Sequence, residues 1–348
     1  MKSGKTAWRS PSNIAVVKYW GKKGFQLPAN PSVSMTLTNC YTETSIEYSE
    51  ISDSKKSCFS FLFQGEKNIA FEKRTGLFLE TAVKELTNLK HLHLNIETSN
   101  SFPHSAGIAS SASSISSLAL CLCDINRRLS GNYENEEQFL RKASHLARLG
   151  SGSASRSVYA GWVLWGEVPG IQYSSDNYAI PLTGSFHERF NSWYDSILVV
   201  DSGVKEVTSS HGHIKMETNP FREIKYETGR ANALSIINAL KTGDEKKFRN
   251  ITEYEALSLH SMFLLSDPPF ILIKPESLQI INRLIRFRRE TAIEFTFTMD
   301  AGPNIHLLYP EYNRDRMISF IKSELEPLCE DGMWIDDRLG LGPELIQT

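Results

Sequence analysis

The sequence predicts a protein of two α+β domains. The chain has 348 residues, and a domain commonly spans about 100–200 residues, so two domains are expected. Strand-like and helix-like stretches are mixed along the chain and joined by long connections, which is typical of the α+β class. The segment 166–184 is rich in Gly, Pro, Ser, Asp and Asn, and it indicates where the domains meet. We therefore expect domains at residues 1–185 and 186–330, followed by a C-terminal tail at 331–348.

The expected elements of the first domain are short strands and amphipathic helices. Strands are predicted where β-forming residues alternate with polar ones or make a short apolar run, and helices where apolar residues recur every three or four positions. In HLHLNI (91–96) the alternation places Leu92, Leu94 and Ile96 inside. Its two outward histidines are more typical of solvated residues than of metal ligands. The predicted strands are 14–17, 45–48, 58–63, 91–96 and 161–165, and the predicted helices are 112–122, 71–86 and 136–149.

The second domain is expected to begin with a strand and to continue with three helices. Two further strands flank a Gly-Pro turn. The tail contains RLGLGPEL, which lacks the strand and helix that a nucleotide-binding glycine motif needs, so we expect it to pack on the surface. The predicted strands are 196–201, 294–299 and 306–309, and the predicted helices are 220–240, 246–264 and 275–290.

Charge and hydropathy exclude two classes of partner. The chain has 38 Lys+Arg and 40 Asp+Glu, a net charge of −2, whereas nucleic-acid binding needs a basic face. A small anion held by a few cations remains possible. The longest unbroken apolar run, 118–123, is far shorter than the roughly 20 residues that span a bilayer, and no apolar segment follows the basic N-terminus as in a signal peptide. We expect neither a nucleic-acid nor a membrane partner.

The five cysteines are scattered, and none has the spacing of a zinc site. An odd, scattered set of this kind favours a reduced, cytoplasmic protein.

A Gly/Ser-rich loop at 103–113 runs directly into a predicted helix. Small residues let a phosphate chain approach the backbone, and the free N–H groups and dipole of the helix N-terminus favour an anion at the same place. Serine hydroxyls there could donate to phosphate or bind Mg²⁺. The loop is not a Walker A motif. The alternative is an ordinary Ser-rich helix cap.

Two further segments carry polar groups next to predicted strands or helices. Lys18, Tyr19, Trp20 and Lys22 follow the apolar strand 14–17, which suits an anionic ligand or a solvated strand end. Arg156 lies among small hydroxyl residues, and its planar fork suits a carboxylate or phosphate, although a surface arginine is the alternative.

Two loops complete the candidate chemistry. Residues 208–212 form a hydroxyl cluster. By itself, this cluster is typical of a loop with a helix cap. Asp300 follows an apolar strand and precedes a Gly-Pro turn, so it is either a positioned base or a turn former.

Together these segments resemble one family, the diphosphomevalonate decarboxylases of the GHMP kinase superfamily. The resemblance covers roughly residues 7–325. KYWGK and DAGPN are specific to this branch, whereas the Gly/Ser-rich motif is shared with sister kinases. The motifs occur in the family's order: NIAVVKYWGK (13–22), PANPSVSMTL (28–37), PHSAGIASSAS (103–113), GSGSASRS (150–157) and MDAGPN (299–304).

The resemblance implies the two-domain GHMP kinase fold. Its N-terminal domain is ribosomal S5 domain 2-like, its C-terminal domain is ferredoxin-like, and the active site lies in the cleft. The implied reaction, in the mevalonate pathway of isoprenoid biosynthesis, consumes ATP with Mg²⁺. It converts mevalonate 5-diphosphate to isopentenyl diphosphate, with ADP, phosphate and CO₂ as co-products. Because relatives are commonly homodimers, a homodimer is expected.

The resemblance also implies roles for individual residues. Asp300 would be the catalytic base for the C3 hydroxyl, Arg156 would hold the substrate carboxylate and help position Asp300, and Lys18 would offset charge on the transferred phosphoryl group. The implied substrate-binding residues are Tyr19, Lys22, Ser151, Ser153, Arg156 and Ser210. The implied ATP-binding residues are Ser105, Ala106, Gly107, Ile108, Ala109, Ser110, Ser111 and Ala112. Ser111 is also the residue expected to contact the metal ion.

Two histidines depart from the family pattern. His211 and His213 replace the residues expected after the Ser-Ser pair, which are Thr or Arg and then Met. The alternative function is therefore a phosphomevalonate decarboxylase or a mevalonate 3-kinase-like enzyme of the same family. The presence of Asp300, Lys18 and Arg156 together argues against an enzyme that only phosphorylates.

Overall fold

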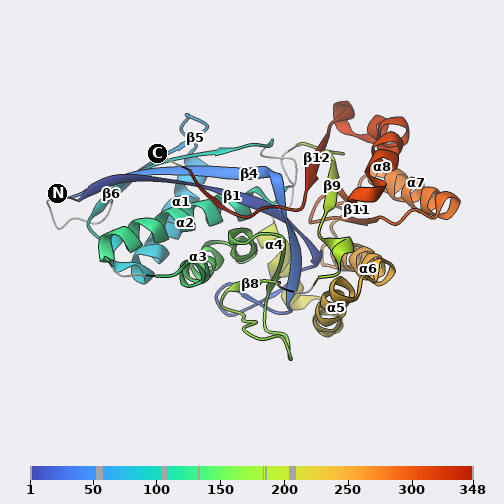
Figure 1. Cartoon of the computed structure of the whole chain (residues 1–348), viewed down its shortest axis with the longest axis horizontal. Helices are drawn as coiled ribbons and strands as arrows, with labels where there is room; N and C mark the ends of the chain where they lie inside the picture. Colours follow the sequence, from blue (N-terminus) through green and yellow to red (C-terminus); the bar gives the residue numbers. More distant parts are fainter. Residues whose placement is uncertain are drawn as a thin grey trace.

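The computed structural model confirms the α+β class. It describes residues 2–51, 58–103, 108–131, 134–182, 184, 186–203 and 209–346, with the backbone alone at 209–211. Two separate β-sheets carry the helices, one sheet in each half of the chain. Figure 1 shows the long strands of the first sheet across the middle of the molecule and the last helices of the chain at its right-hand side.

The first sheet is built on two long antiparallel strands, β1 (Ser3–Val17) and β4 (Ser32–Glu50). Both are much longer than the predicted strands 14–17 and 45–48. The reason is that Ser and Thr occupy buried positions in both strands and interrupt the apolar pattern. Their hydroxyls share hydrogen bonds with serines of the covering helix, which satisfies them inside the core. These pairs are Ser10 with Ser116, Thr42 with Ser113 (2.7 Å) and Thr44 with Ser117 (2.6 Å).

Five more strands complete this sheet, in the order β13-β1-β4-β6-β5, with β7 paired to β4 and β8 paired to β7. β5 and β6 are parallel, and the other pairs are antiparallel. The predicted strands 58–63, 91–96 and 161–165 are confirmed, and Leu92, Leu94 and Ile96 are buried as expected. The bounds are β5 (Cys58–Phe63), β6 (Leu92–Asn100), β7 (Trp162–Trp165), β8 (Ala179–Pro181) and β13 (Glu344–Ile346). A separate hairpin is formed by β2 (Lys22–Lys23) and β3 (Leu27–Pro28).

Three helices cover one face of the first sheet, α1 (Ile69–Glu85), α2 (Ser110–Ser130) and α3 (Glu136–Gly150). All three agree with the predicted helices. α2 lies in the middle of this layer and is buried over most of its length, which explains why small Ser, Ala and Cys residues fill it. A 3-10 helix, η2 (Gly152–Val158), follows α3 and packs against α2 and β1.

The second sheet has the order β10-β11-β9-β12, with all neighbours antiparallel. Its strands are β9 (Trp193–Leu198), β10 (Thr296–Thr298), β11 (Ile305–Pro310) and β12 (Trp334–Arg338). α7 (Pro275–Thr291) and α8 (Arg314–Phe320) share an apolar core with this sheet.

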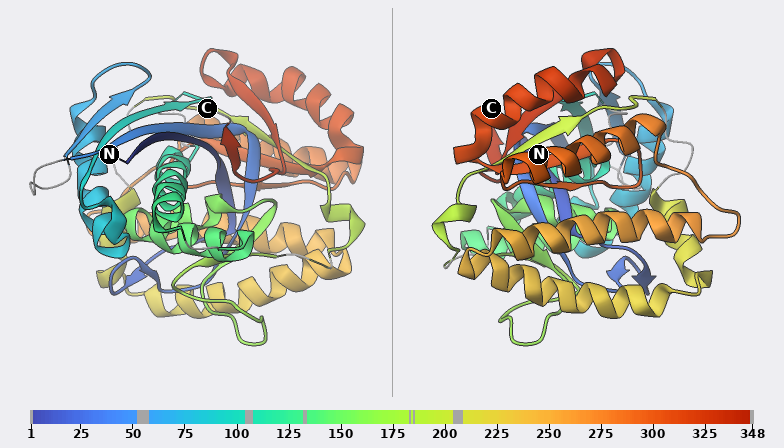
Figure 2. Two further views of the ribbon diagram at one scale, coloured as in Figure 1. Left: turned by 60° about the vertical axis from the view of Figure 1, so that its left-hand side comes forward. Right: turned by 90° about the vertical axis from the view of Figure 1, so that its right-hand side faces the viewer.

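Two long helices, α5 (Arg222–Thr242) and α6 (Glu245–Leu264), run side by side along the other part of the C-terminal half, preceded by the short α4 (Ser209–Lys215). Figure 2 shows this pair below the second sheet. Residues of α5 and α6 belong to one apolar core with β1, β4, β7 and β9, so the two halves of the molecule are packed together. No described helix is both long and apolar enough to cross a membrane.

We expected the segment after residue 330 only to pack on the surface, but it does more than that. It supplies β12 to the second sheet and β13 to the first. Between the sheets, the buried Asp337 accepts hydrogen bonds from the backbone N–H groups of Thr38, Asn39 and Cys40 at 2.7–2.8 Å. The polar, glycine-containing sequence of this segment does not predict these roles. The strands pair through backbone groups, and Asp337 binds backbone N–H groups, so no apolar pattern is needed.

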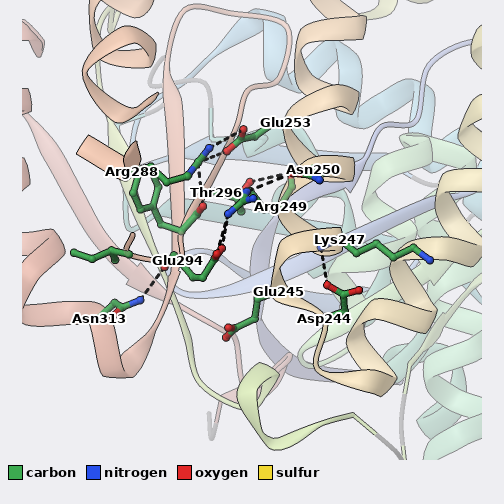
Figure 3. A network of polar contacts seen from close by, with 12 residues as sticks. Asp244, Glu245, Lys247, Arg249, Asn250, Glu253, Arg288, Glu294, Thr296 and Asn313 are labelled. Carbon is green, nitrogen blue, oxygen red and sulfur yellow. Dashed lines mark hydrogen bonds and ion pairs between the residues drawn. The ribbon is translucent and has the colours of Figure 1, made fainter. Parts of the chain in front are cut away.

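A network of charged side chains joins α6 to α7 and to the start of β10 (Figure 3). Arg249 of α6 pairs with Glu294 at 2.7 Å. Arg288 of α7 binds the carboxylate of Glu253 through both terminal nitrogens and also donates to the Phe295 carbonyl oxygen. This network fixes β10, and with it the turn that carries Asp300.

Candidate active site

A cleft of about 890 Å³ lies where the two halves of the chain meet. The end of β1 and the segment 150–156 form its N-terminal side, and the turn after β10 and part of α4 form its C-terminal side. Nine of the residues implied by the family resemblance line it. They are Lys18, Tyr19, Lys22, Ala109, Ser111, Ser151, Ser153, Arg156 and Asp300.

An ion pair between Lys18 and Asp300 joins the two sides of the cleft. Lys18 Nζ lies 2.8 Å from Asp300 Oδ1; the lysine side chain is 3% exposed and the aspartate side chain 32%. Burial lowers the pKa of Lys18 below its usual value, although Asp300 opposes the shift. The Asp300 backbone also forms the turn, since its carbonyl oxygen accepts from Gly302 N–H at 2.8 Å and lies 3.1 Å from His260 Nε2. Asp300 is therefore both a turn residue and a positioned carboxylate.

Arg156 presents an unpaired guanidinium nitrogen at this site. Its Nε lies 3.2 Å from Asn13 Oδ1 and 3.0 Å from Ser34 Oγ, which fixes the plane of the fork. Among the described residues, its buried Nη1 has no hydrogen-bond partner. Burial lowers the pKa of Arg156 to about 10, against the opposing influence of Asp300. A buried donor without a partner is costly, so this nitrogen favours an anionic ligand.

The remaining implied substrate residues surround this pair. The Tyr19 ring lies edge-on to Trp165 at 4.6 Å, and its buried hydroxyl has no partner among the described residues. Ser151 and Ser153 lie at the start of η2, with their hydroxyl oxygens 3.4 Å apart. Burial lowers the pKa of the half-buried Lys22. The backbone of Ser210 lies in α4, but its side chain is outside the part of the chain that the structure describes.

The N-terminus of α2, which we predicted as a phosphate site, lies at the cleft. Ala109 precedes it in the left-handed region, with φ of 40°. Ser111 lines the cleft, whereas Ile108 and Ala112 are buried in the core. The predicted residues Ser105, Ala106 and Gly107 lie outside the described residues.

A second, mostly apolar pocket of about 560 Å³ opens beside the N-terminus of α2. Aromatic residues of β5 and α1 line it together with Ser110 of α2. Arg74 and Ser111 belong to the lining of both the pocket and the cleft, so the two spaces adjoin at these residues.

No group of three His, Cys, Asp or Glu in the described ranges could hold a metal ion by itself. Asp300 and Ser111 both line the cleft, and they carry oxygen ligands of the kind that Mg²⁺ prefers. Magnesium characteristically takes one or two protein oxygens together with substrate phosphates, so these residues fit an ion that arrives with a nucleotide.

Several residues in the cleft or directly behind it were not among the candidates. Asn13 and Arg74 gave no signal of their own, since one lies inside a strand motif and the other in an ordinary amphipathic helix. His213 was noted only as a departure from the family. Glu255 lies in α6, where a charged residue reads as part of a solvated face, yet it is fully buried behind Lys18.

Family models match most of the chain. A model described as "Diphosphomevalonate decarboxylase-like N-terminal domain" matches residues 10–179. A second, described as "Mevalonate 5-diphosphate decarboxylase C-terminal domain", matches residues 196–337.

Individual relatives agree with these models. The chain is 31% identical to the diphosphomevalonate decarboxylase of Aspergillus fumigatus, covering 96% of this chain and 85% of that one. It is 29% identical to the enzyme of Candida albicans, covering 90% and 86%.

Solved structures extend the agreement to three dimensions. The mevalonate diphosphate decarboxylase of Staphylococcus aureus superposes with a TM-score of 0.83 at 29% identity, covering 99% of both chains. A structure described as "MDDEF in complex with MVAPP, AMPPCP and Magnesium" has a TM-score of 0.81 at 30% identity, covering both chains fully.

Proposed function

The chain belongs to the diphosphomevalonate decarboxylase family, with its two-domain α+β GHMP kinase fold, and on that premise we propose how its cleft works. The activity is the ATP-dependent decarboxylation of mevalonate 5-diphosphate to isopentenyl diphosphate. One observation carries the assignment of the reaction to this cleft. The Lys18–Asp300 pair lines the same cleft as Arg156, whose Nη1 has no partner in the described part of the chain, beside the N-terminus of α2.

Asp300 acts on the C3 hydroxyl of the substrate. The hydroxyl oxygen takes the terminal phosphoryl group of ATP, its proton passes to Asp300, and ADP leaves. The tertiary hydroxyl is a poor leaving group, and the phosphate ester is a good one. The C3–O bond then breaks, and inorganic phosphate leaves with its electron pair. The electrons of the bond to the carboxylate carbon form the C2–C3 double bond, and CO₂ leaves. Lys18 offsets the negative charge that gathers at the transferred group.

Arg156 holds the carboxylate that is lost as CO₂. Its Nη1 is a buried donor with no partner among the described residues, and the contacts of Nε with Asn13 and Ser34 fix the direction in which it points. A carboxylate accepting from Nη1 satisfies the nitrogen and places the substrate relative to Asp300. Tyr19, Lys22, Ser151, Ser153 and Ser210 form the rest of the substrate site.

ATP is held at the N-terminus of α2. Its phosphates lie against the loop 105–112, where helix N–H groups and serine hydroxyls favour an anion. We place its nucleoside in the apolar pocket, because Ser111 and Arg74 join that pocket to the cleft. Mg²⁺ bound with ATP neutralises phosphate charge, and Ser111 and Asp300 are the residues that would contact it. The related structure with AMPPCP and magnesium supports this use of nucleotide and metal.

Three further properties belong to the same proposal. The domain boundary lies near residue 185, between β8 of the first sheet and β9 of the second. The enzyme is cytoplasmic, which the five free cysteines support, since disulfides are rare in reducing compartments. It works as a homodimer by analogy with its relatives.

The test is to incubate the purified chain with ATP and Mg²⁺ and with mevalonate, its 5-phosphate or its 5-diphosphate, and to measure ADP and CO₂ separately. One ADP and one CO₂ per turnover, with the diphosphate alone, is the expected result. Release of CO₂ from the 5-phosphate would instead identify a phosphomevalonate decarboxylase, and ADP without CO₂ a mevalonate 3-kinase-like enzyme.

A further inference from the structure

His213 lies against the aromatic residues at the end of β1. Its ring centroid is 4.4 Å from that of Trp20, with the ring planes 24° apart, and 4.5 Å from that of Tyr19. Gly212 makes this close approach possible, because a Cβ atom there would lie 2.5 Å from the Trp20 ring. The imidazole is buried except where it borders the cleft. The ring is thus fixed in the cleft wall.

One hydrogen bond settles which ring nitrogen of His213 carries the proton. The backbone N–H of Gly21 donates to His213 Nδ1 at 3.0 Å, so Nδ1 is an acceptor. In a neutral imidazole the proton is then on Nε2, which is a donor. Burial and the nearby Lys22 lower the pKa of His213 to about 3, so the ring is neutral at working pH. Gly21 is the only hydrogen-bond partner of this ring in the described part of the chain.

The surroundings of His213 are positive and suit an anion. Lys22 is close enough to disfavour protonation of the ring, and Arg74 lowers the pKa of Lys22 in the same way. No carboxylate of the described residues pairs with Lys22. The carboxylate and hydroxyl of the substrate are already matched by Arg156 and Asp300. This leaves the diphosphate for the Lys22 side of the cleft.

We propose that His213 donates a hydrogen bond from Nε2 to the diphosphate of the substrate, beside Lys22, and that this contact contributes to the choice of diphosphate over monophosphate. This inference rests on the proposed function and adds a specificity residue to it. A neutral donor strengthens anion binding without a third mutually repelling cation next to Lys22 and Arg74. The stack on Trp20 and the Gly21 bond hold the donor in place before substrate arrives, which lowers the entropic cost of binding.

Two substitutions at His213 test the contributions of the two ring nitrogens separately. In His213→Asn, the side-chain oxygen takes the place of Nδ1 as acceptor for Gly21, but no donor reaches the position of Nε2. In His213→Gln, the amide NH₂ reaches the position of Nε2, but the acceptor for Gly21 is lost. His145→Asn on α3, outside the lining of the cleft, is the matched control. Titration calorimetry without nucleotide measures binding of mevalonate 5-diphosphate and of the 5-phosphate, and thermal unfolding checks the fold.

The expected result is that His213→Asn weakens binding of the diphosphate by roughly tenfold or more, the usual loss for a hydrogen bond to a charged group. Its binding of the 5-phosphate should fall less, and His213→Gln should retain more diphosphate affinity than His213→Asn. In turnover, the loss should fall on KM for the diphosphate rather than on kcat.

Two outcomes overturn the proposal. One is wild-type affinity for the diphosphate in His213→Asn. The other is an equal loss for both acids accompanied by a lower unfolding temperature, which indicates a purely structural ring. A wild-type chain that binds the diphosphate but releases no CO₂ would refute the proposed function, while the binding measurements would still decide the role of His213.

Discussion

The carboxylate of Glu255 accepts a hydrogen bond from the backbone N–H of Lys18 at 3.0 Å, although the two residues are 237 positions apart. The same carboxylate lies 2.6 Å from Lys225 Nζ and 2.7 Å from Asn232 Nδ2. Glu255 is fully buried and Lys225 nearly so. Helices α5 and α6 therefore hold the end of β1 in place, and with it the lysine that contacts Asp300.

Replacing Glu255 by Gln should destabilise the protein strongly. The buried ammonium group of Lys225 loses its counter-charge, a change that typically costs about 3–5 kcal/mol. The midpoint of urea unfolding measures the effect. In the double variant Glu255→Gln, Lys225→Met, no unpaired charge is left, so much of the stability should return. Equal stabilities of the single and double variants would contradict this account of the pair.

Replacing Asp300 by Asn should lower kcat by roughly 10²- to 10⁴-fold, the usual contribution of a general base. The amide keeps the shape and the contact with Lys18, but it cannot take the proton of the C3 hydroxyl. ADP release should fall together with CO₂ release, because phosphorylation comes first. Asp315→Asn, on the exposed face of α8, is the matched control. Turnover unchanged in Asp300→Asn would remove this residue from the reaction.

Replacing Arg156 by Ala should raise KM for mevalonate 5-diphosphate by roughly tenfold or more, and KM for ATP much less. The substrate carboxylate loses the donor that Nη1 supplies. Arg156→Lys should restore only part of the affinity, because an ammonium group lacks the planar fork. Initial-rate kinetics with each substrate varied in turn would check both variants. A rise confined to ATP would place Arg156 on the nucleotide side instead.

Stability should fall as pH decreases from about 6.5 toward 4. Burial lowers the pKa of His213 to about 3 and that of His260 to about 4, while in the unfolded chain both titrate near the ordinary value of about 6.5. Between these values the unfolded chain binds more protons, so the free energy of unfolding rises with pH, by at most about 1.4 kcal/mol per pH unit for each histidine.

Urea unfolding at several pH values checks this expectation. The His213→Asn variant should show a smaller slope over this pH range than the wild type, whereas the control His91→Asn, at an exposed position before β6, should not. Identical slopes in all three proteins would mean that His213 does not contribute.

The chemistry of the site was more predictable than its architecture. Lys18, Arg156 and Asp300 could be found because each follows a strand or small-residue motif that suits an anion or a base. Their convergence could not be derived from spacing, since Lys18 and Asp300 are 282 positions apart. The family resemblance supplied that relation.

Other features could not be predicted, because no pattern in the sequence indicates them. The lengths of β1 and β4 are hidden by buried serines and threonines that bond to α2. Glu255 resembles any surface charge on a helix until its partners in α5 and β1 are known.

The pairing of β13 with β1 also has a consequence for biosynthesis. Arg9 and Glu344 form an ion pair across these strands at 3.3 Å, 335 positions apart. During translation, residues 7–9 on the outer edge of β1 therefore stay unpaired until β13 has left the ribosome. An unpaired edge strand can pair with the edge of another chain. A nascent polypeptide of this sequence can thus self-associate through this part of the edge until β13 pairs with it.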